Sequence, residues 1–173
     1  MSMHLIIDGY NLIRQSKVLS PLDRQDIARG REALIGRLAA YRRLKPHRIT
    51  VVFDGIQAPD LSPTRDRVQG ITIVFSRRGE SADTVITRMA RQEAGQAMVV
   101  SSDLALARAA EACGAAAIDS PEFEARMAMA VAMEGSAEPA EEPPGRRVST
   151  RKKGEGRRLP KRLRQQRMKA AKL

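Results

Sequence analysis

Only one cysteine, Cys113, occurs among the 173 residues, so the chain can form neither an internal disulfide nor a metal site built from its own cysteines. The sequence also lacks any run of 18 apolar residues, and no charged-then-apolar signal segment precedes its first apolar stretch. These absences argue against a disulfide-stapled domain and against a membrane-spanning helix. We therefore expect a soluble, cytoplasmic protein with no membrane partner.

Positive charge is concentrated at the C-terminal end. Residues 1–140 carry 18 Lys and Arg against 17 Asp and Glu, whereas residues 141–173 carry 13 against 3. Such a polybasic segment binds polyanions, and the two candidates are nucleic acid and an anionic membrane surface. Because membrane features are missing, nucleic acid is favoured. The basic side chains predicted to contact RNA here are Arg146, Arg147, Arg151, Lys152, Lys153, Arg157, Arg158, Lys161 and Arg162.

Composition divides the chain into three parts. Residues 1–134 have the apolar content of a folded domain, and residues 135–145 are a Pro- and Glu-rich linker. Residues 146–173 contain no aromatic residue and too few apolar residues to fold alone, so we predict a disordered basic tail.

Short apolar runs alternate with helical patterns along residues 1–134. The runs at 3–8, 48–53, 71–75, 98–100 and 115–118 predict strands. Helices are predicted over 21–44, after Ser81, from a cap at Ser102 or Asp103 to Cys113, and over 121–133, and residues 55–70 are predicted to be a mobile loop. Alternation of this kind predicts an α/β fold, a parallel sheet with helices on both faces.

A carboxylate follows four of these strands. Asp8 ends the first and Asp54 the second, Glu80 and Asp83 follow the third, and Asp103 follows the fourth. An Asp after a strand commonly caps the next helix, so one alone is weak evidence. Together they would crowd the carboxyl edge of the sheet, where α/β folds bind ligands. Carboxylates that repel one another raise their pKa values unless a cation lies among them, and Mg²⁺ or Mn²⁺ prefers such oxygen ligands.

Four collinear motifs resemble one known family. They are Asp8-Gly-Tyr-Asn-Leu-Ile, Val51-Val-Phe-Asp-Gly, Phe75-Ser-Arg-Arg-Gly-Glu-Ser-Ala-Asp-Thr-Val-Ile and Val99-Val-Ser-Ser-Asp. In this order they resemble the NYN domain, in particular its YacP-like branch, within the PIN-like nuclease superfamily. The resemblance implies a Rossmann-like sheet and a metal-dependent ribonuclease. It implies catalytic roles for Asp8, Asn11, Asp54, Asp83 and Asp103, with Glu80 a further candidate.

The resemblance thus points to RNA as the polymer and to internal cleavage, that is, to an endoribonuclease. Two Mg²⁺ or Mn²⁺ ions roughly 4 Å apart would activate a water and stabilise the leaving 3′ oxygen. In that scheme Asp8 is the bridging metal ligand, Asp83 and Asp103 are flanking ligands, and Asp54 or Glu80 orients the nucleophile or contacts the metal through water. Asn11 would hold a carboxylate or a metal-bound water in place. A substrate phosphate would be clamped by Arg77 and Arg78.

Other classes fit less well. A phosphatase of the haloacid-dehalogenase type needs a second Asp two residues after the first, where this chain has Tyr10, and a receiver domain needs a Lys after the fifth strand, where Ile118-Asp119-Ser120 has none. The stronger alternative is a non-catalytic RNA-binding or ribosome-associated protein, since the basic tail resembles those of ribonucleoprotein components. Messenger, ribosomal and transfer RNA all fit these features, and the ribosome is a candidate partner.

Overall fold

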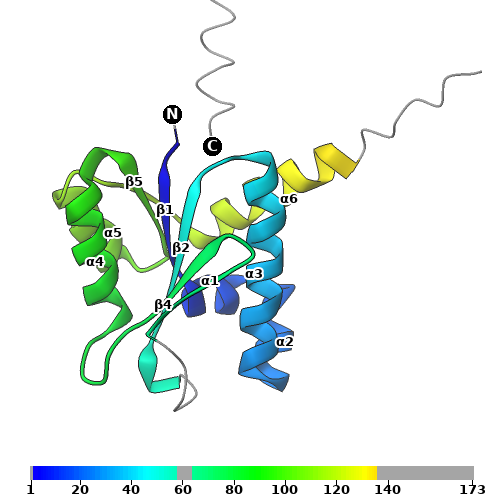
Figure 1. Ribbon diagram of the computed structural model, residues 1–173, viewed down its shortest axis with the longest axis horizontal. Coiled ribbons are helices and arrows are strands. Elements are labelled where there is room, and N and C mark those ends of the chain that lie inside the picture. The colour runs from blue at the N-terminus through cyan, green and yellow to red at the C-terminus, as the bar shows by residue number, and fades with distance from the viewer. Residues whose placement is uncertain (1, 58–63, 136–173) are drawn as a thin grey trace, which may run out of the picture.

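The computed structural model describes residues 2–57 and 64–135, which form one α/β unit (Figure 1). Its six strands lie in the order β3-β4-β2-β1-β5-β6, and every neighbouring pair is parallel except β3 with β4. The strands are β1 (His4–Asp8), β2 (Arg48–Phe53), β3 (Arg65–Val68), β4 (Ile71–Phe75), β5 (Ala97–Val100) and β6 (Ala116–Ile118). The helices are α1 (Gly9–Gln15), α2 (Leu19–Gln25), α3 (Ile27–Leu44), α4 (Ala82–Glu93), α5 (Leu104–Ala112) and α6 (Ser120–Gly135).

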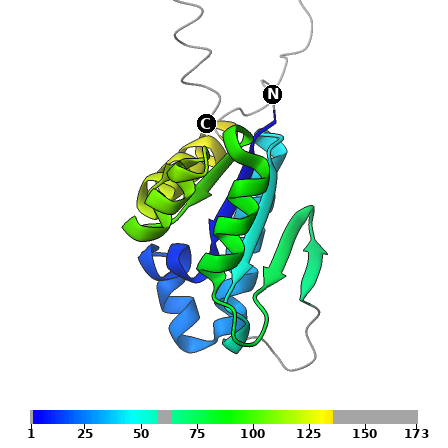
Figure 2. The same cartoon turned by 90° about the vertical axis from the view of Figure 1, so that its left-hand side faces the viewer.

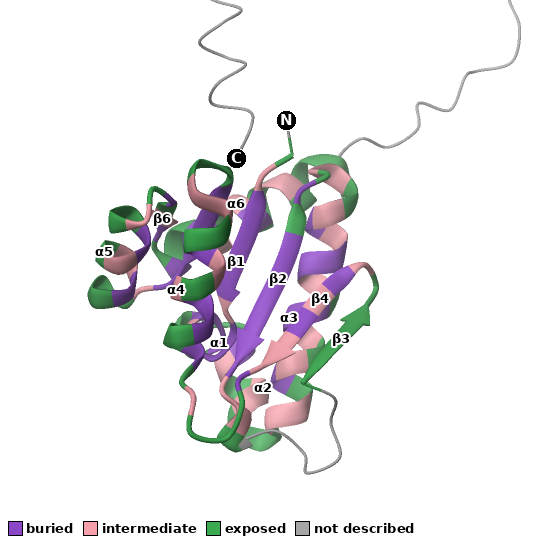
Figure 3. Cartoon of the chain, turned by 60° about the vertical axis from the view of Figure 1, so that its left-hand side comes forward, coloured by how far each residue is buried: buried purple, intermediate pink, exposed green. Residues whose placement is uncertain are grey.

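Helices cover both faces of the sheet, as the sequence predicted. In Figure 1 the strands lie between α4 and α5 on one side and α1, α2, α3 and α6 on the other. Successive strand residues point to opposite faces. Leu5 and Ile7 therefore join the apolar cluster under α1, α3 and α6, whereas Ile6 joins the cluster under α4 and α5. The central strands are buried along their length and β3 is exposed (Figure 3).

The predicted helix over 21–44 is wrong in its continuity, because the chain breaks at Asp26. This residue is extended, with φ −159° and ψ 119°, and its carboxylate accepts the N–H of Ala28 at 2.8 Å, which caps α3. The turn brings α2 against α3 so closely that a Cβ at Gly30 would lie 2.9 Å from the Cβ of Asp23. A helical apolar pattern can continue through such a cap, so periodicity alone missed it.

Two further elements were not predicted. Helix α1 begins directly after β1, with Asp8 as its N-cap, and buries Leu12 and Ile13 completely. The segment predicted as a loop over 55–70 contains β3, an edge strand whose four residues are all exposed. Because β3 buries no apolar face, its sequence carries no strand periodicity. Gly70, with φ +83°, turns the chain back into β4.

The remaining boundaries follow the sequence expectations closely. Ser81 caps α4, Asp103 caps α5, and Gly114 ends that helical segment with φ +87°. Within residues 2–57 and 64–135, no helix is long and apolar enough to cross a membrane. The predicted linker beyond residue 135 and the predicted basic tail lie outside the described residues.

Candidate active site

Four carboxylates meet at the carboxyl edge of the sheet. Asp8 is the last residue of β1, Asp54 follows β2, Asp83 lies in the first turn of α4 after β4, and Asp103 follows β5. These four strands are neighbours, in the order β4-β2-β1-β5. The acids interact electrostatically: the charges of Asp83 and Asp103 raise the pKa of Asp8, and the charges of Asp103 and Asp54 raise the pKa of Asp83. The structure thus places the four predicted aspartates at the same edge of the sheet.

Asp8 is a largely buried carboxylate with a strongly perturbed pKa. Burial raises its pKa from the ordinary value of 3.8 to about 6, and the charges of Asp83 and Asp103 contribute to the rise. Two hydrogen bonds work in the opposite direction: Oδ1 accepts the N–H of Asn11 at 3.5 Å, and Oδ2 accepts the hydroxyl of Ser101 at 3.3 Å. Desolvation is therefore a larger cause than the mutual repulsion that the sequence predicted.

Asp83 and Asp103, whose charges act on Asp8, differ in what already binds them. Burial raises the pKa of Asp83, and the nearby charges of Asp103 and Asp54 add to the effect. Asp103 is the N-cap of α5, with Oδ1 accepting the N–H groups of Ala105 and Leu106 at 2.8 and 3.1 Å. Asp103 can therefore cap α5 and still belong to the acidic cluster, because the cap uses Oδ1 alone.

Asn11 holds three segments together at this edge. Its side-chain oxygen accepts the N–H of Ser102 at 2.9 Å and the hydroxyl of Ser120 at 2.8 Å, and its backbone N–H donates to Asp8. Asn11 thus ties α1 to the loop after β5 and to the start of α6. The sequence predicted a supporting role for Asn11, and the contacts define it as fixing the loop that carries Asp103.

Ser101 was missed by sequence reasoning. It is buried, donates to Asp8 and accepts the N–H of Asp103 at 3.1 Å, so it links two of the acids. The signal for it was its position in Val99-Val-Ser-Ser-Asp103, directly between a buried strand and an acid.

Two glycines let the acid-bearing loops approach the sheet. A Cβ at Gly9 would overlap the ring of Phe53, and a Cβ at Gly55 would overlap the carbonyl oxygen of Ser76. The N–H of Gly55 also donates to the Ser76 hydroxyl at 2.9 Å. Each glycine directly follows an aspartate of the cluster, and at both positions the close approach leaves no room for a Cβ.

Glu80 is not brought into the cluster. Its carboxylate pairs with Arg88 at 2.5 Å, and the Arg88 hydrogen bond is the first cause that lowers the pKa of Glu80. It is absent from the groups that act on Asp8 and Asp83. The loop before it exposes Arg77 and Arg78, which line a hollow of about 420 Å³ together with Gly79, Glu80 and Arg88.

The donor set suits a hard divalent cation. Oxygen ligands with raised pKa values, as in Asp8 and Asp83, are those that Mg²⁺ or Mn²⁺ stabilises by binding the ionised form. Across residues 2–57 and 64–135, no three His, Cys, Asp or Glu side chains are already close enough to hold an ion. The site therefore fits such an ion in the chemistry of its donors rather than as a preformed cage.

Comparison with known proteins finds a matching family. The sequence profile of the YacP-like NYN domain matches residues 5–172. The uncharacterized protein YacP of Bacillus subtilis (strain 168) is 31% identical over 89 residues, which are 50% of this chain and 51% of that protein, so this chain spans about half the length of that relative.

Solved structures share the fold. The crystal structure of Rae1 (YacP) from Bacillus subtilis is 25% identical, has a TM-score of 0.67 and covers 79% of each chain. A tryptophan-to-leucine mutant of Rae1 from the same organism is 24% identical, has a TM-score of 0.63, and covers 78% of this chain and 84% of that one. The family match supports a ribonuclease type of function in general. On the extent of that match, the chain belongs to the family of YacP-like NYN domains.

Proposed function

We propose that this protein is a metal-dependent endoribonuclease whose active site is the cluster of Asp8, Asp54, Asp83 and Asp103. The observation that carries the proposal is the convergence of four carboxylates from four adjacent strands on one edge, with the pKa of the central Asp8 raised to about 6. A buried carboxylate whose pKa is raised in this way destabilises the fold when it is ionised, so it indicates a function that needs it.

The phosphodiester substrate is an anion, and an acidic cluster repels it. Asp8, Asp83 and Asp103 would therefore hold Mg²⁺ or Mn²⁺. When bound, the metal offsets the phosphate charge and lowers the pKa of a water nucleophile. Asp54, whose Oδ1 accepts the N–H of Ile56 at 3.0 Å, uses its second oxygen to orient that water. Ser101 and Asn11 keep Asp8 and the Asp103 loop in position.

The arginines near this edge supply the positive charge that the acids lack. Arg77 and Arg78 are exposed on the loop that precedes α4, where they line the hollow beside Glu80. A guanidinium binds a phosphate through two parallel hydrogen bonds. These two residues bind the phosphate next to the scissile bond, and the basic segment 146–173 increases affinity for RNA or for the ribosome.

The test uses purified full-length protein and a mixed RNA pool, with Mg²⁺, Mn²⁺ or EDTA. Asp8→Asn and Asp83→Asn should each reduce cleavage by about 100-fold, an order of magnitude typical of lost metal ligation or its support. Asp66→Asn is the matched control, because it makes the same chemical change on the exposed strand β3. Full activity in both cluster variants would refute the assignment.

A non-catalytic RNA-binding role is the second candidate. It is favoured by the use of Asp8, Asp54 and Asp103 as acceptors for backbone N–H groups, a structural role that acids at strand ends can fill. Under this alternative, RNA would bind without being cut in any metal, and Asp8→Asn would leave RNA affinity unchanged or higher.

A further inference from the structure

A groove runs along one side of α4 on the face of the sheet that this helix covers. Helix α4 packs against β1, β2 and β5, and the sheet extends beyond it to β4 and β3. Figure 2 shows the β3–β4 hairpin turned away from α4. Between them lies a hollow of about 410 Å³, within the roughly 300–1,000 Å³ of ligand sites. Arg48, Arg65 and Arg88 line it, with the hydroxyl-bearing Thr50 and Thr72.

Positive charge dominates this hollow. Its lining contains three arginines and one carboxylate, that of Glu93. Arg48 pairs with Glu93, and Arg88 pairs with Glu80 at 2.5 Å. The two arginine side chains are 55% and 54% exposed, and exposed pairs of this kind are weak enough to exchange their carboxylate for another anion.

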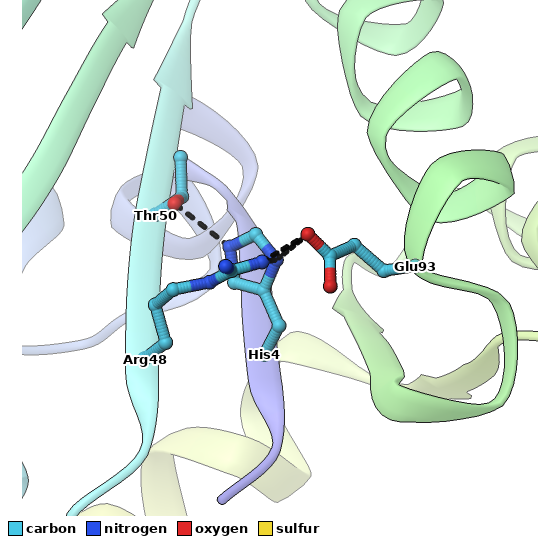
Figure 4. Close-up of polar contacts among 4 residues, drawn as sticks. All are labelled: His4, Arg48, Thr50 and Glu93. Carbon is cyan, nitrogen blue, oxygen red and sulfur yellow. Dashed lines mark hydrogen bonds and ion pairs between the residues drawn. The ribbon is translucent and has the colours of Figure 1, made fainter.

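His4 orients one of these arginines without adding charge. Its Nδ1 lies 2.6 Å from Arg48 Nη2, and its Nε2 lies 2.8 Å from the hydroxyl of Thr50 (Figure 4). A guanidinium only donates, and the Glu93 oxygen beside the same Nδ1 is farther away, at 3.6 Å, so Nδ1 accepts from Arg48 and Nε2–H donates to Thr50. Burial, then the charge of Arg48, lowers the pKa of His4 to about 4. His4 is therefore neutral near pH 7 and holds Arg48 at the end of the hollow.

Two further hollows continue this one in both directions. The hollow beside Arg77 and Arg78 shares Arg88 with it and leads toward the acidic edge. A third, of about 410 Å³, shares Arg48, Arg65 and Thr72 with it and lies at the other end. We name the three together the arginine groove, after its lining residues Arg42, Arg48, Arg65, Arg67, Arg77, Arg78 and Arg88.

We propose that the arginine groove binds the phosphodiester backbone of single-stranded RNA as the strand leaves the acidic cluster. This inference rests on the proposed function for the identity of the polymer. Arginine forks match phosphate oxygens, and the hydroxyls of Thr50 and Thr72 add donors. The 12 residues of α4 span ~18 Å, the rise of about five stacked nucleotides. Because no Phe, Tyr or Trp is among the described lining residues, bases are not stacked and binding does not depend on sequence.

The test measures binding of fluorescent 12-nucleotide RNAs, oligo(U) and oligo(A), to the full chain in EDTA across 50–300 mM salt. The groove variant carries Arg65→Gln and Arg88→Gln. The control carries Arg91→Gln and Arg108→Gln, two arginines outside the groove on α4 and α5. The basic tail is present in both proteins, so its contribution cancels from the comparison.

Losing two phosphate contacts should make the log-log salt slope shallower by about 1.4, and should weaken binding about 25-fold at 0.1 M salt if the curves converge near 1 M. The loss should be equal for both RNAs and absent in the control. Groove and control variants that bind alike would overturn the proposal, as would a loss confined to one sequence. If an acidic peptide displaced the labelled RNA as effectively as an unlabelled 12-mer RNA does, the groove would be assigned to binding of protein instead.

Because binding is measured in EDTA, this result is independent of cleavage. A groove effect without any cleavage by the wild type would keep the RNA groove and reject the nuclease. Cleavage by the wild type with no groove effect would keep the nuclease and reject the groove.

Discussion

Replacing Asp8 by asparagine should stabilise the folded protein at neutral pH, whereas the loss of a hydrogen-bonded side chain usually destabilises a protein. The ionised Asp8 is costly in the folded protein, because burial and the charges of Asp83 and Asp103 raise its pKa from 3.8 to about 6. This rise in pKa lowers the free energy of unfolding by about 3 kcal/mol when Asp8 is ionised, at about 1.4 kcal/mol for each pKa unit. Asp8→Asn removes this cost wherever Asp8 would be ionised.

The sign of the pH dependence follows from the protons bound. Between about pH 4 and pH 6 the folded protein retains the Asp8 proton that the unfolded chain has lost, so the free energy of unfolding falls as pH rises through this window. Below the unfolded value of 3.8 both states are protonated and the cost disappears. Asparagine offers one acceptor oxygen, so either Asn11 N–H or the Ser101 hydroxyl loses its partner, a penalty of about 1 kcal/mol.

Urea denaturation of the full chain in EDTA measures both effects. At pH 8 we expect Asp8→Asn to be more stable than the wild type by about 2 kcal/mol, and at pH 4 to be equal or less stable by about 1 kcal/mol. Asp66→Asn, on exposed β3, should show no such difference between the two pH values. A stability change that is the same at pH 4 and pH 8 would refute the assignment of strain to Asp8.

Three other perturbations test the site and its surroundings. Cleavage should stop in EDTA, return with Mg²⁺ or Mn²⁺ and be poorly supported by Ca²⁺, whose longer and less regular coordination suits the site badly; cleavage that resists EDTA would point to a metal-free mechanism. Removing residues 146–173 should weaken RNA binding for all sequences and flatten the log-log dependence of affinity on salt by about 0.7 per lost phosphate contact. Cleavage of a short saturating substrate should survive. An unchanged salt slope would contradict the role of that segment in RNA binding. Gly55→Ala should lower the free energy of unfolding by several kcal/mol, because a Cβ at this position would overlap the Ser76 carbonyl oxygen. Gly95→Ala should be neutral, because nothing lies within 4 Å of a Cβ there. Equal urea midpoints for the two variants would contradict the close approach of Gly55 to Ser76.

The sequence was a good guide wherever the signal is local. Short apolar runs predicted β1, β2, β4, β5 and β6, and single capping residues such as Ser81 and Asp103 marked the starts of α4 and α5. It failed where the pattern is ambiguous. The break at Asp26 lies inside a continuing apolar repeat, and β3 has no buried face to leave a period in the sequence.

The candidate site was predictable in part for the same reason. An aspartate directly after a buried strand must lie at the carboxyl edge of a parallel sheet, so the sequence alone predicts that Asp8, Asp54 and Asp103 share this edge. Whether Glu80 belongs to the acidic cluster could not be predicted in this way, because it does not directly follow a strand. It lies three residues before Asp83 in sequence, and only the position of Arg88 on the next turns of α4 draws it out of the cluster.

By itself, the sequence determined the class of fold and the kinds of residue at the edge, because hydrophobic period and capping act over a few residues. Tertiary structure alone decided which acids are neighbours, since strand order depends on how the crossovers pack. It also decided the burial that perturbs Asp8, the position of Ser101 behind it, and the meeting of Arg48, Arg65 and Arg88 in one groove. Those three arginines come from β2, β3 and α4, and no local pattern links them, because only the packing of a helix beside a hairpin brings them together.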